Sequence, residues 1–243
     1  MATGIGILES AGGKGLPLSP LTQLTLRNSY LSLDAFERAS NVSLVPLQWL
    51  PLALLGRSEE MQQSAQRYLK DNIAPFSDYL EALAYQQDWS LMVRYLDTGW
   101  QDPDDLIKHL DLSFHGHILA HLSVALARTG DPQRAAAYLQ RQGEINERLA
   151  QQGVDDAWFH LSRARYAMLK NNKEAALESL EQFAAKNGML APKFWAAEEE
   201  LAFAPLRGTP RYEAMKADNL SRVNQQRALL ELPPLRASSG QME

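Results

Sequence analysis

The 243-residue chain contains no cysteine, so disulfides, thiolate zinc sites and a cysteine nucleophile are all excluded. Basic residues are also comparatively few. Lysine and arginine number 24 against 29 acidic residues, which gives a net charge of −5, and they form no run. Affinity for nucleic acid comes mainly from lysine and arginine at phosphates, so we expect no direct nucleic-acid partner.

Long hydrophobic runs are missing as well. The most apolar stretch, residues 42–55, is interrupted by Pro46, Gln48 and Pro51. It falls short of the roughly 20 residues that a membrane-spanning helix needs. The first residues have neither the basic start nor the apolar core of a secretory signal. We therefore expect a soluble cytoplasmic protein without a membrane span, or a periplasmic one if the chain is the tail of a membrane-anchored regulator.

A repeated turn is the most informative feature that is present. Each copy has a Gly or Asn, a few polar residues, and then a small or slim residue that opens an amphipathic helix. The copies are residues 56–61, 130–135 and 171–176, with a weaker one at 86–92. An apolar helical segment precedes each strong copy. Repeated helix–turn–helix units predict an α-solenoid, in which no unit can bury its apolar face alone.

The apolar spacing inside these units is helical. Leu119, Leu122 and Leu126 form one stripe, and Leu177, Leu180 and Phe183 form another. Small residues, Ser123 and Ala164, precede Ala135 and Ala176 by the same distance, as a close helix crossing requires. No alternating β pattern competes, so we predict an all-α fold.

Two segments carry a resemblance to the tetratricopeptide-repeat superfamily: ILAHLSVALARTGDPQRAAAYL and AWFHLSRARYAMLKNNKEAALESL. The resemblance covers roughly residues 42–190. Two of the repeat intervals exceed the tetratricopeptide period of about 34 residues. The resemblance implies a right-handed, tetratricopeptide-like solenoid of helical hairpins that acts as an interaction module.

The pattern changes after the repeats. We expect four parts: a flexible lead-in or linker at 1–20, the repeat domain at 21–208, a capping helix within 209–235, and a disordered tail at 236–243. The capping helix is expected to run from about 211 to 231. Its apolar face comprises Tyr212, Met215, Leu220 and Val223, whereas Lys216, Arg222 and Arg227 are expected to face water. Such a cap keeps the last apolar face of an array from solvent.

The ending FAPLRGTPRYEAM, with the loop LDTGWQDPDDL, is similar to the C-terminal repeat regions of bacterial signalling proteins. In that group the repeats follow an adenylyl-cyclase domain or a winged-helix regulator domain. The resemblance implies a non-catalytic protein–protein interaction or scaffold module, the sensory or partner-binding region of a signalling or transcription regulator. Any enzymatic output would lie in a domain that this sequence does not contain.

We predict that the first helices of successive repeats line a groove that binds a protein or peptide. The partner-binding candidates share helical phase on those helices: Glu81, Tyr85, His117, His121, Arg128, Trp158 and Arg165. Trp158 and Tyr85 would anchor the partner. Arg128 and Arg165 would donate to carboxylates, which favours an acidic partner. We expect no cofactor.

Two rivals remain open. The histidines His115, His117 and His121 could bind a metal in a helical-repeat enzyme, since His117 and His121 are one turn apart. Alternatively, the groove could sense a small molecule. The other candidate cluster, the acidic run Glu198–Glu199–Glu200, is expected to be a solvated helix face.

Overall fold

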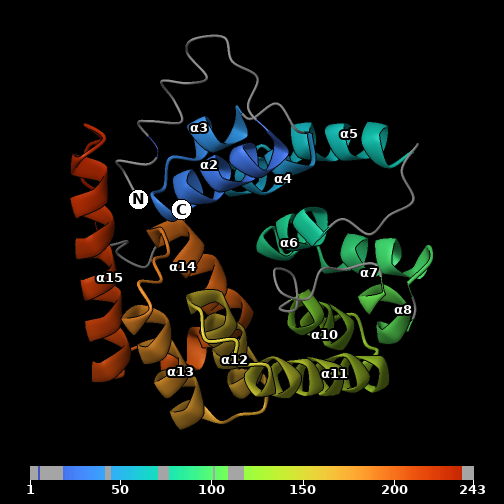
Figure 1. The fold of residues 1–243 in the computed structure, drawn as a ribbon. Coiled ribbons are helices and arrows are strands. Elements are labelled where there is room, and N and C mark those ends of the chain that lie inside the picture. Colours follow the sequence, from blue (N-terminus) through green and yellow to red (C-terminus); the bar gives the residue numbers. More distant parts are fainter. Residues whose placement is uncertain are drawn as a thin grey trace.

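The computed structural model describes Ile5 and residues 19–41, 45–70, 77–100, 102–108 and 118–236. Across these ranges the chain is helical and contains no strand, which confirms the all-α prediction. Figure 1 shows the helices arranged in sequence around a central region. The α-helices are α2 (Pro20–Ser32), α3 (Phe36–Ser40), α4 (Val45–Leu54), α5 (Ser58–Leu69), α6 (Ser77–Tyr85), α7 (Trp89–Asp97), α8 (Pro103–Ile107), α10 (Ile118–Arg128), α11 (Pro132–Gln151), α12 (Ala157–Leu169), α13 (Lys173–Ala185), α14 (Pro192–Glu198) and α15 (Pro210–Ala228). A π-helix, Glu199–Phe203, and a 3-10 turn, Ala204–Leu206, follow α14.

The four repeated turns share one backbone geometry. Each has a residue with positive φ, namely Gly56 (75°), Gln87 (57°), Gly130 (91°) and Asn171 (57°). The next amide donates to the carbonyl five residues back, at 2.8–3.0 Å: Arg57 to Leu52, Asp88 to Leu83, Asp131 to Leu126 and Asn172 to Ala167. This is the Schellman ending of a helix, for which Gly and Asn are preferred. The same hydrogen bond also follows the positive-φ residues Asp34, Gly153, Asn187 and Glu231, so the four repeated turns share an ending that is general in this chain.

After three of these turns, a side chain caps the N-terminus of the next helix. Asp88 accepts from the Leu91 amide at 3.1 Å, and Asp131 accepts from the Arg134 amide at 3.1 Å. Asn172 accepts from the Ala175 amide at 3.1 Å. Each cap satisfies an amide that the first turn of the helix would leave unpaired. A Schellman ending followed by a side-chain cap explains why these helices pack back as hairpins.

Small residues permit close packing within the hairpins. Ser123 of α10 donates its hydroxyl to the Ala135 carbonyl of α11 at 2.9 Å. In the hairpin α12–α13, Ala164 and Ala176 both have 0% exposure. Ser123 therefore meets α11 at the predicted position, and Ala164 and Ala176 are buried in the packed pair α12–α13.

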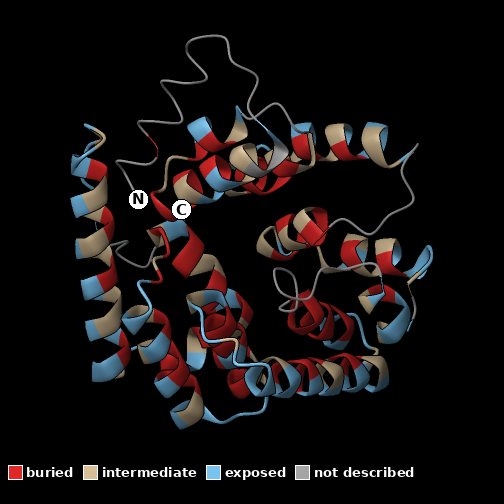
Figure 2. Ribbon diagram, viewed as in Figure 1, coloured by how far each residue is buried: buried red, intermediate tan, exposed pale blue. Residues whose placement is uncertain are grey.

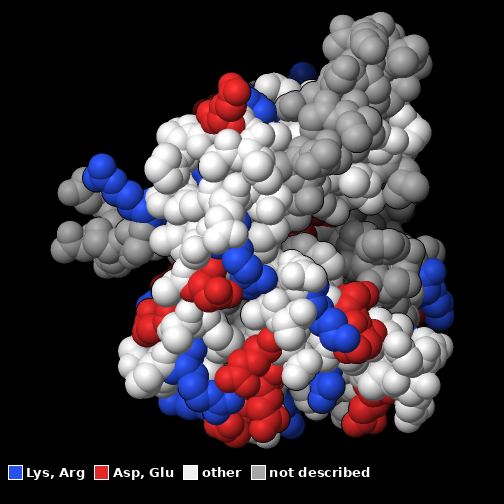
Figure 3. Space-filling view, turned by 60° about the vertical axis from the view of Figure 1, so that its left-hand side comes forward, with Lys and Arg blue, Asp and Glu red and all other residues white. Residues whose placement is uncertain are grey.

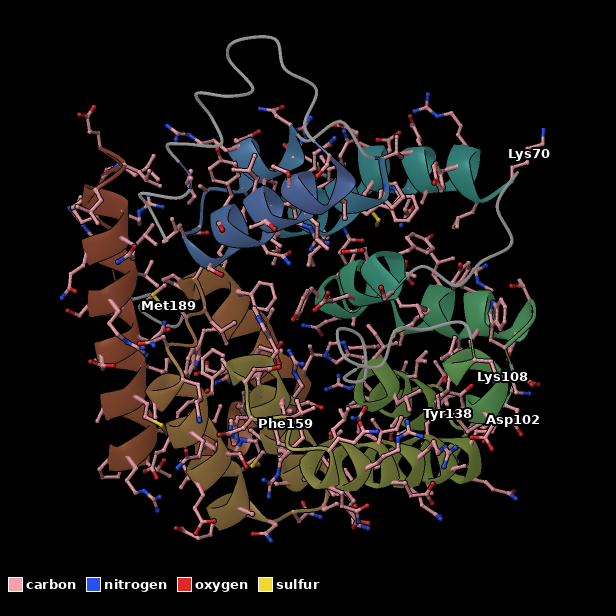
Figure 4. All side chains as sticks on the ribbon, viewed as in Figure 1. Lys70, Asp102, Lys108, Tyr138, Phe159 and Met189 are labelled. Atoms are coloured by element: carbon pink, nitrogen blue, oxygen red, sulfur yellow. The ribbon has the colours of Figure 1, made fainter. Side chains whose placement is uncertain are left out.

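Two clusters of buried apolar residues make up the core. Figure 2 marks the buried residues in red along each helix. The middle core draws its buried residues from α4–α8, α10 and α11, with Leu201. At its edge, Tyr138 of α11 donates to the Trp100 carbonyl at 2.7 Å, and Arg141 lies 2.7 Å from Asp104 of α8. Figure 4 shows Tyr138 beside α8, which carries Asp102 and Lys108 at its ends.

The closing core joins the two ends of the described chain. It contains Ile5 and residues of α2–α4 together with residues of α12–α15. Hydrogen bonds also hold α15 against the closing core. Asn219 accepts from the Leu190 amide at 3.0 Å and donates to the Leu190 carbonyl at 2.6 Å. Trp195 donates to the Tyr212 hydroxyl at 2.8 Å. The helices therefore form a closed arrangement, with α15 seated against α13 (Figure 1).

The expected apolar face of α15 is confirmed in part, since Tyr212 and Val223 are buried and Met215 packs against the closing core. The expectation for Arg227 is wrong. Its side chain is buried and donates to the carbonyls of Leu33 and, at 2.8 Å, Pro233. Those two carbonyls replace the water that a surface arginine would have. The helix ends at Ala228 rather than 231, where the chain turns toward the two prolines.

Parts of the expected domain plan lie outside the described residues, including most of the lead-in and the tail at 237–243. Ile5, inside the lead-in, is 2% exposed and belongs to the closing core. Over the described ranges, no helix combines the length and apolarity that crossing a bilayer would need.

Candidate functional site

A buried ion pair, Arg165 with Glu198, joins α12 and α14. Arg165 of α12 donates Nε to Glu198 Oε2 at 2.7 Å and Nη2 to Glu198 Oε1. Arg165 is 2% exposed and Glu198 is 0% exposed. Burial alone would lower the pKa of Arg165, but the charge and hydrogen bonds of Glu198 raise it above its usual value. The two-bond geometry offsets part of the cost of burying both charges.

Tyr85 of α6 completes this central cluster of Tyr85, Arg165 and Glu198. Its hydroxyl donates to Glu198 Oε1 at 2.5 Å and lies 3.3 Å from Glu81 Oε1. Burial, reinforced by the charges of Glu198 and Glu81, raises the pKa of Tyr85 well above 10. The phenol therefore remains a neutral donor across the physiological range.

The central cluster connects three helices rather than presenting reactive groups. One positive and one negative charge compensate each other, and the phenol donates to the carboxylate. Phe194 of α14 covers Tyr85 with ring centroids 4.8 Å apart, and His121 of α10 approaches it at 5.9 Å. The arrangement fixes α6, α10, α12 and α14 relative to one another.

The structure brings together four of the seven predicted site residues: Glu81, Tyr85, His121 and Arg165. Helical phase predicted that these four residues line a binding groove, whereas in the structure they contact one another or share Tyr85 and Glu198 as partners. However, His121 is 1% exposed and Arg165 is 2% exposed, so neither lines an open groove among the described residues. His117 lies outside the described residues. Arg165 donates to an internal carboxylate instead of a partner's.

The acidic run is not a solvated face, because Glu198 and Glu199 are both buried. A signal for this was present in the sequence. Phe194, Glu198 and Leu201 follow the i, i+4, i+7 spacing of one helical stripe, so Glu198 shares the side of two large apolar residues. The π-helix that begins at Glu199 then changes the phase, and such π segments recur at functional sites.

Glu199, the first residue of the π-helix, forms an ion pair with Lys216 of α15. It accepts from Lys216 Nζ at 2.6 Å and from Arg207 Nε at 3.0 Å. Burial alone would raise the pKa of Glu199, but these two hydrogen bonds outweigh it and lower the pKa below its usual 4.5. Lys216, expected in water, is thus half-buried and paired.

Arg128 and Trp158, the remaining predicted residues, are exposed. Arg128 ends α10, and its guanidinium carbon lies 5.2 Å from the ring centroid of Trp89 on α7. Trp89, which sequence reasoning did not select, is partly buried against the middle core. Trp158 is 46% exposed at the start of α12, with its ring 6.4 Å from that of Phe183.

The metal alternative has no support within the described part of the chain, where no three potential ligands among His, Asp and Glu come together. His115 and His117 lie outside it. The central cluster pairs its carboxylate with a guanidinium and a phenol, which are not metal ligands in that arrangement.

Comparison of the chain with protein-family models, curated proteins and solved structures finds no match. The tetratricopeptide resemblance therefore remains a prediction from the sequence.

Proposed function

We propose that this chain is a non-catalytic protein-interaction module built as a tetratricopeptide-like, right-handed solenoid. Helical hairpins with shared turn geometry support the class. The sensory or partner-binding region of a bacterial signalling protein is the setting that the sequence resemblance favours. Among the described residues, Glu81, Tyr85, His121 and Arg165 of the predicted groove are engaged in internal contacts, so we place the partner on the outer surface.

The main observation behind this proposal is that the Trp158 side chain is exposed to solvent. Trp158 and Leu229 are the large hydrophobic side chains that stand exposed among the described residues, at 46% and 67%. Tryptophan is enriched among the residues that dominate binding energy at protein interfaces. Phe183 contacts its ring edge-on, which limits the conformational freedom that binding would otherwise remove.

A charged rim accompanies the indole. Asp155, three residues before Trp158, forms an ion pair with Lys186, three residues after Phe183. Asp155 also lies 2.6 Å from His160 Nε2. Hydrogen bonds from Lys186 and His160 lower the pKa of Asp155, which keeps the carboxylate ionised at neutral pH. An aromatic anchor with a polar rim is the usual anatomy of an interface centre.

Affinity purification tests the proposal, with the tagged chain expressed in its native cells and retained proteins quantified by mass spectrometry. We expect a specific partner whose recovery falls about tenfold or more with Trp158→Ala, as for an interface hot spot. Leu229→Ala is the matched control because it also removes an exposed apolar side chain. Equal recovery from all three forms, or no retained partner, would contradict the proposal. Circular dichroism establishes that all three are folded.

A further inference from the structure

We propose that Arg128, stacked on Trp89, forms a second binding site, which takes a carboxylate of an acidic peptide segment. This site goes beyond the interaction proposed at Trp158. It is carried by a different observation and can be tested on the purified chain alone.

The geometry holds the guanidinium in place. Its carbon lies 5.2 Å from the indole centroid, and the two residues come from packed helices, α10 and α7. The middle core holds the Trp89 platform. A guanidinium stacked on an indole keeps its in-plane N–H groups available, and that edge matches the two oxygens of a carboxylate.

No described residue forms an ion pair with Arg128 or accepts a hydrogen bond from its guanidinium. The carboxylates on the flanking turns have other partners. Asp88 caps the Leu91 amide, and Asp131 caps the Arg134 amide. Asp97 lies 3.0 Å from Arg134 Nη2. Among the residues that the structure describes, the Arg128 guanidinium is therefore exposed and has no acceptor.

The charge balance favours a carboxylate over a polyanion. One open guanidinium matches a single negative charge, whereas a phosphate group near −2 calls for further donors. The nearest other arginine along the chain, Arg134, is already paired. The chain as a whole carries a net charge of −5, which does not favour the polyanion of a nucleic acid. On the face that Figure 3 brings forward from the left-hand side of Figure 1, basic and acidic side chains are interspersed.

The experiment measures fluorescence anisotropy of a labelled hexaglutamate peptide with the purified full chain at low salt. We expect saturable binding that weakens about tenfold or more in Arg128→Gln, because a charged hydrogen-bonded pair is lost. The affinity of Arg128→Lys should lie between those of the wild type and Arg128→Gln, since lysine keeps the charge but cannot donate two parallel hydrogen bonds to one carboxylate. Trp89→Leu, checked for folding by circular dichroism, should also weaken binding because the platform is gone.

Arg163→Gln is the matched control. Arg163 is also exposed and lies 5.7 Å from an aromatic centroid, but that ring is Phe159 of its own helix. We expect this variant to bind like the wild type. The proposal is overturned by an absence of wild-type binding, by equal binding of hexaglutamine, or by equal losses in Arg128→Gln and Arg163→Gln. Tighter binding of a phosphoserine peptide than of hexaglutamate would overturn the carboxylate assignment.

Discussion

The hairpins α10–α11 and α12–α13 are held together differently from the helices that close the molecule. Within each hairpin, the two helices pack against each other through apolar stripes and one small-residue position. The closing helices share an apolar core as well, and buried polar contacts between residues distant in sequence, such as Asn219 with Leu190 and Arg165 with Glu198, add to it. Apolar hairpin packing tolerates variation in detail, whereas a buried polar contact fails when one partner is removed.

The largest expected effect comes from breaking the central cluster. Glu198→Gln leaves the Arg165 charge buried without its counter-charge, so the free energy of unfolding should fall by about 3–5 kcal/mol. Urea denaturation followed by circular dichroism measures the loss. Amide hydrogen exchange should increase more in α2, α14 and α15 than in α7, α10 and α11, whose buried residues belong to the middle core.

The double variant Arg165→Met/Glu198→Leu is the control for that change. It removes both charges and keeps apolar volume, so most of the lost stability should return. A Glu198→Gln protein within about 1 kcal/mol of the wild type would show that the pair does not secure the closure.

A smaller loss is expected inside a hairpin. Ala176 is 0% exposed at the α12–α13 crossing, so Ala176→Leu should overpack it and cost about 1–3 kcal/mol. The same denaturation measurement applies. Ala185→Leu, at the exposed end of α13, should change stability by less than about 0.5 kcal/mol. Similar values for both variants would mean that the crossing is looser than the structure shows.

The smallest effect depends on pH. Because the folded-state pKa of Glu199 lies below its usual 4.5, this carboxylate stabilises the fold above about pH 4.5. The contribution is lost as the pH falls through the lower folded-state value. Lys216→Met should therefore cost about 1 kcal/mol at pH 7 and progressively less in acid. Urea titrations of both proteins at pH 7 and at pH 3 measure this; a cost independent of pH would assign it to the lysine stem.

Much of the hairpin region could be predicted from sequence because its determinants are local. Gly130 and Asn171 mark helix endings by the backbone conformation they tolerate, and Leu119 to Leu126 follow one helical stripe. Helical phase also predicted that Arg165 lines a groove, and the structure buries it. Its partner could not be identified, because Glu198 comes from a helix whose position depends on the whole array.

The same reasoning explains the mixed outcome for the candidate site. Exposure of Arg128 and Trp158 follows from their positions at helix ends, but the stacking of Arg128 on Trp89 requires α7 and α10 to pack together. Arg227 was expected in water because it was placed outside the apolar face of the capping helix, yet the Leu33 carbonyl that it meets lies 194 residues away in the sequence. Local patterns carry no information on such distant acceptors.

Because Arg227 and Leu33 lie far apart in the sequence, their contact can form only late in protein synthesis. Ribosomes add roughly 5–20 residues per second, so α2 and α3 wait about 10–40 s for the arginine that meets them. During that interval the apolar surface destined for the closing core lacks its C-terminal partners. Completion of that core is thus a late event, and a nascent chain paused before α15 would be the species most exposed to chaperones and to aggregation.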